Sequence, residues 1–259
     1  MEPNLRDLPS LQRGMTLYVN YCLGCHSLKF QRYERTADDL GIPHDVALAN
    51  LVFPGRARAE GRDGPAIGDL MHTAMPPERA QQWFGKPPPD LTMVDRVRGT
   101  AWVYNMLKNF YVDPKRDFGF NNRVYENIGM PHVLVGLQGV PRLKETGLKA
   151  VDILDGKDGL LRKRDGGEFV TSVTASDEVG GEDPVIRGKR YVLEVDPGTA
   201  AMSPEEFDQA AYDIANFLHY VGDPGRLDRQ RLGLWVLGFL VGLFVLATLL
   251  NREYWKDVH

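Results

Sequence analysis

Both cysteines of the 259-residue chain lie close together near its start, in the stretch YCLGCH at 21–26. Two cysteines three positions apart, followed directly by a histidine, form the C-x-x-C-H attachment pattern of a c-type haem. In that chemistry Cys22 and Cys25 each add to one vinyl group of the porphyrin, and His26 becomes the proximal ligand of the iron. The pattern therefore predicts one covalently attached haem c held by these three residues.

Other chemistry is possible at the same residues, but the surroundings do not favour it. A thioredoxin-like redox pair belongs in a βαβ context, whereas the residues before Cys22 follow a helical pattern. A zinc site needs two more ligands. The remaining histidines are scattered along the chain, at 44, 72, 132, 219 and 259. A disulfide across two residues would be strained. We therefore interpret the motif as a haem attachment site.

A second axial ligand would close the iron to substrates and suit it to electron transfer. Met130 lies between Gly129, which permits close backbone approach, and Pro131, which fixes the chain beyond it. The long segment 112–127 before it has little regular pattern, and such loops are often functional. The sequence predicts Met130 as the distal ligand, and three alternatives remain open: His132, Met71 and Met75.

Apolar residues at helical spacing predict the helices that position these motifs. Ser10 is expected to cap a helix that delivers Cys22 to a turn containing Gly24, with the porphyrin against the apolar stripe of that helix. A second helix is predicted over 100–111. Met15 and Met106 fit the stripes of these two helices and are expected in the core.

A third helix begins at Ser203-Pro204-Glu205-Glu206, which is an S-x-x-E capping box with proline in the first turn. Its apolar face repeats at helical spacing: Phe207, Ala211, Ile214, Phe217, Leu218 and Val221. The sequence at 222–225, GDPG, ends the helix. His219 is expected to be a surface or packing residue.

The stretch 232–250 contains 19 residues without a charge. As a helix it would be about 28 Å long, close to the hydrocarbon thickness of a bilayer. Tyr254 and Trp255 follow it and suit the membrane interface. We expect a haem domain at 1–222, a hinge at 223–231, a transmembrane anchor in membrane lipid at 232–251 and a tail at 252–259.

The orientation of this anchor is predicted from chemistry rather than from charge. Arginines at 226, 229 and 231 alone would favour a cytoplasmic N-terminal side. Covalent haem, however, is installed outside the cytoplasmic membrane in bacteria. The first residues contain no apolar signal sequence, so we expect an exported, processed form. The haem domain is then periplasmic and the C-terminus cytoplasmic, at the bacterial inner membrane.

The composition excludes a nucleic-acid-binding protein, because the net charge is −4 and no basic segment stands out. Apolar residues make up 43% of the chain, which is enough for a packed core.

The motifs, taken in order, resemble the bacterial cytochrome c1 family, the haem subunits of cytochrome bc1 complexes, over nearly the whole chain. The matching stretches are YCLGCHS at 21–27, PPPDLTMVDRVRG at 87–99, WVYNMLKNFY at 102–111, NNRVYENIGMPHVL at 121–134 and NREYWKDVH at 251–259. The resemblance implies a mainly α fold: a class I cytochrome c-like haem domain with long loops and a small β excursion, plus one C-terminal transmembrane helix.

The resemblance also implies roles for single residues. Cys22, Cys25, His26 and Met130 match the family's thioether cysteines and axial ligands. Arg98 resembles the arginine that pairs with a haem propionate, and Arg96 competes for this role. The wall of the haem crevice matches Pro88, Pro89 and Leu91, together with Asp90.

The segment 136–201 departs from the family. It contains two alternating stretches, EFVTSVTAS and KRYVLEV, with an acidic loop between them. We expect a surface excursion with a β-hairpin.

The function implied by the resemblance is electron relay without substrate chemistry in the chain itself. Electrons would pass from a Rieske iron–sulfur protein to a soluble c-type cytochrome. The complex, which includes cytochrome b and is expected to be a dimer, would couple quinol oxidation to proton translocation. One alternative is another membrane-tethered c-type cytochrome that serves an oxidase or reductase. A second is a haem-based sensor or peroxidase with an open iron.

Overall fold

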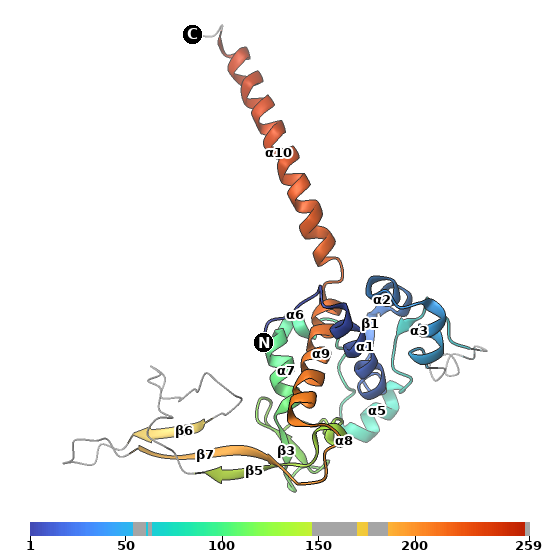
Figure 1. Cartoon of the computed structure of the whole chain (residues 1–259), viewed down its shortest axis with the longest axis vertical. Helices are drawn as coiled ribbons and strands as arrows, with labels where there is room; N and C mark the ends of the chain where they lie inside the picture. Colours follow the sequence, from blue (N-terminus) through green and yellow to red (C-terminus); the bar gives the residue numbers. More distant parts are fainter. Residues whose placement is uncertain (54–60, 62–63, 147–169, 176–185, 257–259) are drawn as a thin grey trace, which may run out of the picture.

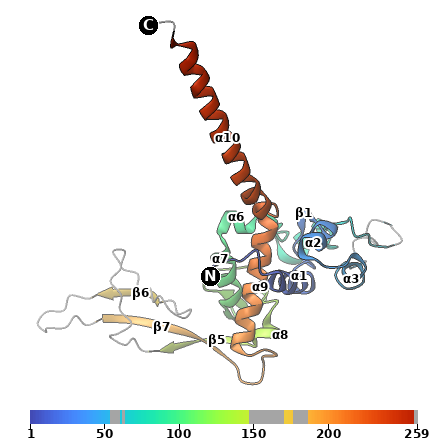
Figure 2. The same cartoon turned by 45° about the horizontal axis from the view of Figure 1, so that its top comes forward.

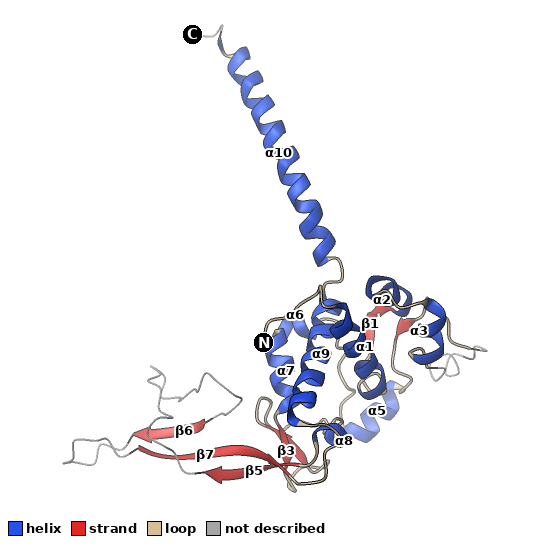
Figure 3. Cartoon of the chain, viewed as in Figure 1, coloured by secondary structure: helices blue, strands red, loops and turns tan. Residues whose placement is uncertain are grey.

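The computed structural model describes residues 1–53, 61, 64–146, 170–175 and 186–256. Helices dominate it, as expected, and three small antiparallel sheets complete it (Figure 3). The helices are α1 (Leu8–Tyr21), α2 (Tyr33–Leu40), α3 (His44–Asn50), α5 (Pro77–Phe84), α6 (Val94–Arg98), α7 (Thr100–Lys108), α8 (Val135–Gln138), α9 (Pro204–Gly222) and α10 (Arg226–Tyr254). The strands are β1 (Leu28–Arg32), β2 (Leu70–Met71), β3 (Phe110–Val112), β4 (Phe120–Asn122), β5 (Pro141–Thr146), β6 (Val170–Ala175) and β7 (Ile186–Val195).

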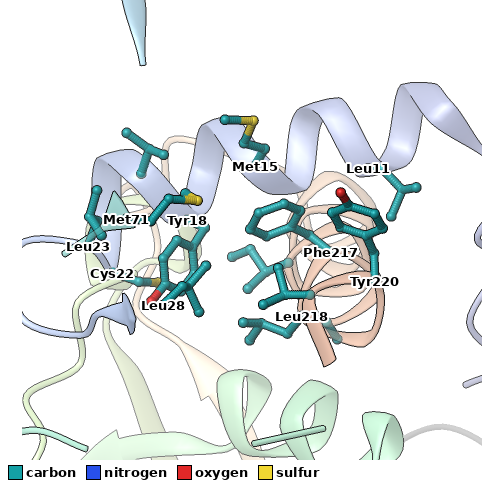
Figure 4. Packing of buried hydrophobic residues seen from close by; sticks show 14 of the residues in the cluster. Leu11, Met15, Tyr18, Cys22, Leu23, Leu28, Met71, Phe217, Leu218 and Tyr220 are labelled. Atoms are coloured by element: carbon teal, nitrogen blue, oxygen red, sulfur yellow. The ribbon is translucent and has the colours of Figure 1, made fainter. Parts of the chain in front are cut away.

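The core is built where α1 crosses α9 (Figure 4). The predicted stripes of both helices are buried, and the ring of Tyr18 on α1 lies 5.8 Å from that of Phe217 on α9. The stripe of α1 therefore faces α9. Met15 lies in this core, as predicted.

Gly14 permits the close approach of the two helices. A Cβ at this position would lie 2.1 Å from the carbonyl oxygen of Asp213 and 2.7 Å from Cβ of Phe217. Since a backbone oxygen cannot move aside cheaply, only glycine fits the crossing.

Replacing Gly14 by alanine is expected to destabilise the protein by about 1–3 kcal/mol, the usual cost of overpacking a core. A lower denaturation midpoint would show this. The control is Gly136→Ala, because an added Cβ at Gly136 meets nothing within 4 Å. Equal midpoints for the two variants would contradict the prediction.

Ser10 does not cap α1, contrary to the prediction. The cap is Asp7, whose carboxylate accepts a hydrogen bond from the backbone N–H of Ser10 at 3.1 Å. The Ser10 hydroxyl instead donates to the buried carboxylate of Asp213 at 2.7 Å, and Arg13 also pairs with that carboxylate at 2.6 Å. The buried charge on α9 needs these donors, because an unpaired carboxylate in the core would be costly.

The predicted capping box at the start of α9 is confirmed. The Ser203 side chain accepts from the Glu206 N–H at 3.2 Å, and the Glu206 carboxylate accepts from the Ser203 N–H at 2.8 Å.

Ser203→Ala is expected to cost about 1 kcal/mol of stability, because it leaves an N–H of the first turn without its acceptor. Chemical denaturation should detect this loss. The matched variant Glu206→Gln keeps a capping box and should lose less. A Ser203→Ala protein as stable as the wild type would argue against this role of the box.

Two predictions for the segments that precede Met130 were wrong. The helix expected over 100–111 ends at Lys108, and its last residues form β3. The segment 112–127 is not wholly irregular, because β4 pairs with β3 as a short hairpin, with Tyr111 opposite Asn121. Backbone pairing across the hairpin, which periodicity does not reveal, decides both differences.

The two predicted strands of the excursion form β6 and β7, and a third strand, β5, was missed. The strand order is β5-β7-β6, all antiparallel. The sheet extends to one side of the helical body (Figures 1 and 2). The acidic loop expected between β6 and β7 lies, apart from its first two residues, at 176–184, outside the described residues.

The helix α10 carries the apolar stretch and is the one candidate membrane span among the described residues. It extends away from the helical body as one continuous helix (Figure 1). The hinge predicted at 223–231 is shorter than expected, because the helix already begins at Arg226 and leaves only 223–225 between α9 and α10.

Candidate haem site

The C-x-x-C-H residues follow α1 as a tight turn. The N–H groups of Cys22 and His26 donate to the carbonyl oxygens of Tyr18 and Cys22, both at 2.8 Å. Cys22 is buried, Cys25 is half-buried, and neither forms a disulfide. Burial raises the pKa of the Cys22 thiol to about 12. Because neither cysteine is in a disulfide, both side chains are free thiols, as thioether formation requires.

The ring of His26 is oriented by a residue far along the chain. Its Nδ1 lies 2.7 Å from the carbonyl oxygen of Pro89. Since a carbonyl only accepts, Nδ1 carries the proton and Nε2 keeps its lone pair for a metal. The Tyr18 hydroxyl fixes the backbone by donating to the His26 carbonyl at 2.8 Å. Burial of the ring lowers the pKa of His26, which favours the neutral form that a ligand requires.

The predicted crevice segment lies beside this histidine. The N–H of Leu91 donates to the Ser27 carbonyl at 2.9 Å, and the Asp90 carboxylate accepts from the N–H of Lys29 at 2.8 Å. Pro88 is half-buried, and Pro89 is exposed apart from its carbonyl contact. These bonds hold 88–91 against the residues that follow the attachment motif.

Met130 lies in a loop that is half-buried and tied down by its neighbours. The Asn121 side chain accepts from the N–H of Asn127 at 2.9 Å, and Asn127 adopts a left-handed conformation with φ 59°. The Asn122 amide donates to the Met106 carbonyl at 2.7 Å. These two buried asparagines were not predicted, although their adjacency just before a functional loop is a sequence signal.

The alternative ligands occupy different surroundings. Met71 is fully buried in β2, with the Thr36 hydroxyl 3.9 Å from its sulfur. Met75 is half-buried in a loop. His132 is buried, and its ring stacks on Phe110 at 4.7 Å between centroids. Burial lowers the pKa of His132 to about 4. Met106 is half-buried against the core, close to its expected place.

The two arginines of α6 point to opposite sides, because residues two apart lie about 200° apart around a helix. Arg96 lies 3.7 Å from Asp223 at the junction of α9 and α10. The guanidinium carbon of Arg98 lies 5.3 Å from the ring centre of Trp102. Trp102 in turn contacts Tyr125, at 6.3 Å between ring centroids, in the loop that leads to Met130. Arg98, and not Arg96, therefore shares a side with the Met130 loop.

His219 was expected at the surface or in packing, and it instead joins a polar network. It bonds the buried carboxylate of Asp95 at 2.8 Å, and Asp95 also accepts from the Thr100 hydroxyl. Burial alone would raise the pKa of Asp95, but the hydrogen bonds from His219 and Thr100 lower it below its usual value.

This lowered pKa gives Asp95 a stabilising effect that depends on pH. The contribution is fully present above the unfolded-state pKa of about 4 and is lost as the pH falls through the lower folded-state value. The stability gap between the wild type and Asp95→Asn should therefore narrow between about pH 5 and 3. Denaturation midpoints across this range test the prediction, and a gap that stays constant contradicts it.

The donor set at the motif fits a haem c. Two thiols lie three residues apart, and the imidazole presents only Nε2. Thiols suit thioether bonds to a porphyrin, while imidazole and thioether are the axial pair of electron-transfer haems. Among the described residues no cluster of three or more His, Cys, Asp or Glu could hold a metal ion without such a group.

The model of the Cytochrome C1 family matches residues 4–140 and 196–258. The chain belongs to this family. A cytochrome c1 of Allochromatium vinosum is 44% identical over 256 residues, which cover 99% of this chain and 87% of the relative. A cytochrome c1 of Rhodobacter capsulatus is 23% identical over 96% of this chain and 83% of its own length. An "Ammonia monooxygenase gamma subunit" of Nitrosomonas europaea is 34% identical over 98% of this chain and 85% of its own length.

Family membership settles the cofactor and the general role. Members of the Cytochrome C1 family carry one covalently attached haem c and are subunits of the bc1 oxidoreductase complex, with cytochrome b and a Rieske protein. The match leaves out 141–195, which is the stretch that contains β5, β6 and β7. The three-stranded sheet therefore lies within the stretch that the family pattern does not cover.

Proposed function

We propose that this chain relays single electrons from the Rieske iron–sulfur protein to a soluble c-type cytochrome. The bond between His26 Nδ1 and the Pro89 carbonyl carries the proposal, because it fixes the ring with Nε2 free for the iron. When bound, haem c supplies a one-electron iron couple. The residues of the chain hold that group, orient it and exclude substrates, so the chain performs no substrate chemistry itself.

The proposed site is divided among several segments. Cys22 and Cys25 form the two thioether bonds, and His26 and Met130 are the axial ligands. Arg98 neutralises a haem propionate, since its guanidinium shares a side with the Met130 loop. The segment of Pro88, Pro89 and Leu91 walls the crevice, supported by its bonds to the residues after the motif.

The proposed location of the haem domain is the periplasm, with the C-terminus in the cytoplasm. Two of the three arginines that oppose this orientation are bound to residues that precede the membrane helix. Arg229 pairs with Asp223 through two bonds, at 2.5 and 3.0 Å, and Arg226 bonds His219 at 2.7 Å. Arginines that are bonded to a folded domain stay on the same side of the membrane as that domain. This supports an orientation that is set by haem attachment rather than by these charges.

The proposed complex couples quinol oxidation to proton translocation as a dimer. Residues 1–225, which precede the membrane helix, include 26 basic and 32 acidic residues, a net charge of −6. A soluble electron acceptor with a basic face would be attracted to it, most strongly at low salt.

Purification of the tagged chain from its native membrane tests this function. We expect a multi-span b-type cytochrome and a Rieske protein to co-purify, and quinol to reduce the haem. Purification with subunits of an oxidase, a reductase or an ammonia monooxygenase instead would contradict the proposal. Ready binding of carbon monoxide to the reduced protein at neutral pH would indicate an open iron, as in a sensor or peroxidase.

A further inference from the structure

The short helix α6, which carries Arg98, is held in the domain by a carboxylate. Asp95 is the one residue of this five-residue helix that is buried, with 5% of its side chain exposed. It accepts hydrogen bonds from Thr100 at the start of α7 and from Nδ1 of His219 on α9, the latter at 2.8 Å. A helix this short is not stable by itself, so its position depends on such contacts.

The opposite nitrogen of His219 joins the membrane helix to the same network. A guanidinium nitrogen of Arg226, the first residue of α10, lies 2.7 Å from Nε2 of His219. Because a guanidinium only donates, Nε2 accepts, and Nδ1 carries the proton that it donates to Asp95. The His219 side chain is 12% exposed. A single neutral imidazole therefore connects α6, α9 and α10.

The position of α6 decides where the charge of Arg98 lies. On one side of the helix, Arg96 packs beside Gly222, where an added Cβ would be 3.2 Å from the Arg96 side chain. On the other side, Arg98 lies over Trp102, next to the loop of Met130. A shift or rotation of α6 would therefore move the Arg98 guanidinium relative to this loop.

We propose that Asp95 and His219 are positioning residues, which hold α6 so that Arg98 keeps its place beside the haem. This inference rests on the proposed role of the site in electron transfer. A fixed cation near the iron disfavours the ferric form, which has one more positive charge. Loss of the Asp95 contacts would let Arg98 move away, and the oxidised form would become more favourable.

The test is a redox titration of the full chain in its membrane complex. We expect Asp95→Asn to shift the reduction equilibrium toward the oxidised form by about threefold to tenfold, where tenfold corresponds to about 59 mV. The absorption spectrum should remain that of iron with two axial ligands. Arg98→Gln should give a shift at least as large, and Asp95→Asn should add nothing further to it.

The matched control is Asp213→Asn, a second buried carboxylate whose partners Ser10 and Arg13 lie on α1, not on α6. It should lower stability and leave the reduction equilibrium unchanged. Two His219 variants provide a second test in case the Asp95→Asn protein does not fold. His219→Asn retains a donor for Asp95 and should keep the wild-type equilibrium, whereas His219→Leu removes the donor and should shift it.

Several results would overturn the inference. One is an equal shift of the reduction equilibrium in Asp95→Asn and Asp213→Asn. Another is a further shift of the same size when Asp95→Asn is added to the Arg98→Gln protein. The third is a His219→Leu protein that keeps the wild-type reduction equilibrium. If Arg98→Gln leaves the reduction equilibrium unchanged while Met130→His alters it, the result contradicts the positioning role of Asp95 and His219. It remains consistent with the proposed electron transfer at this haem. If the Met130 variant has no effect either, the proposed ligand set fails as well.

Discussion

Met130→His is expected to lower the reduction potential of the haem on the order of 0.1 V or more, within the range of about 0.8 V that axial ligands cover. Methionine as the partner of histidine raises the potential, and a second imidazole removes this effect. Met130→Ala should open one face of the iron, so that the reduced protein binds carbon monoxide. Redox titration and absorption spectra of the purified protein measure both effects.

The controls for Met130 are its nearest competitors. Met75→Leu should leave the potential and the spectrum unchanged, because the proposed distal ligand is Met130 and not Met75. Met71→Leu replaces one buried apolar side chain by another of similar volume and should behave in the same way. An unchanged potential in both Met130 variants would show that another residue is the distal ligand, and His132 would be the next residue to replace.

Replacing Cys22 and Cys25 together by serine is expected to abolish covalent attachment of haem. A serine hydroxyl lacks the nucleophilic sulfur that forms a thioether with a vinyl group. Each single variant should retain at most one thioether bond. Haem staining of the protein after denaturing electrophoresis gives the result directly: the double variant should show no stain at 29.1 kDa.

Gly24→Ala is the matched control for the cysteine variants. It alters the same loop, but an added Cβ at Gly24 meets nothing within 4 Å, so attachment should be retained. Stained haem on the double serine variant would show that the group is held by other bonds. Loss of stain in Gly24→Ala would show that the loop conformation, rather than the two thiols, limits attachment.

Features that depend on neighbouring residues could be predicted from the sequence. The spacing of Cys22, Cys25 and His26 specifies haem attachment because both thioether bonds and the proximal ligand come from one turn. The capping box at Ser203 and the apolar stretch 232–250 are equally local, since one helix end and one bilayer thickness decide them. The structure confirmed the capping box and the long apolar helix, because no distant residue has to complete them.

Predictions failed where a distant residue provided the partner. Ser10 has the side chain of a helix cap, but the buried charge of Asp213, about two hundred positions later, binds its hydroxyl. The end of the helix expected over 100–111 became β3, because β4 offered its residues backbone hydrogen bonds. Local propensity contributes less free energy than a buried unpaired polar group costs.

The sequence by itself thus determined the cofactor and the candidate membrane helix, and it predicted the attachment residues, because each follows from short covalent spacing or length. The tertiary structure alone decided which nitrogen of His26 is free, since the Pro89 carbonyl that binds the other one comes from a separate loop. It also separated Arg96 from Arg98, and gave His219 its link from Asp95 to Arg226. These choices depend on contacts between segments that only the folded chain brings together.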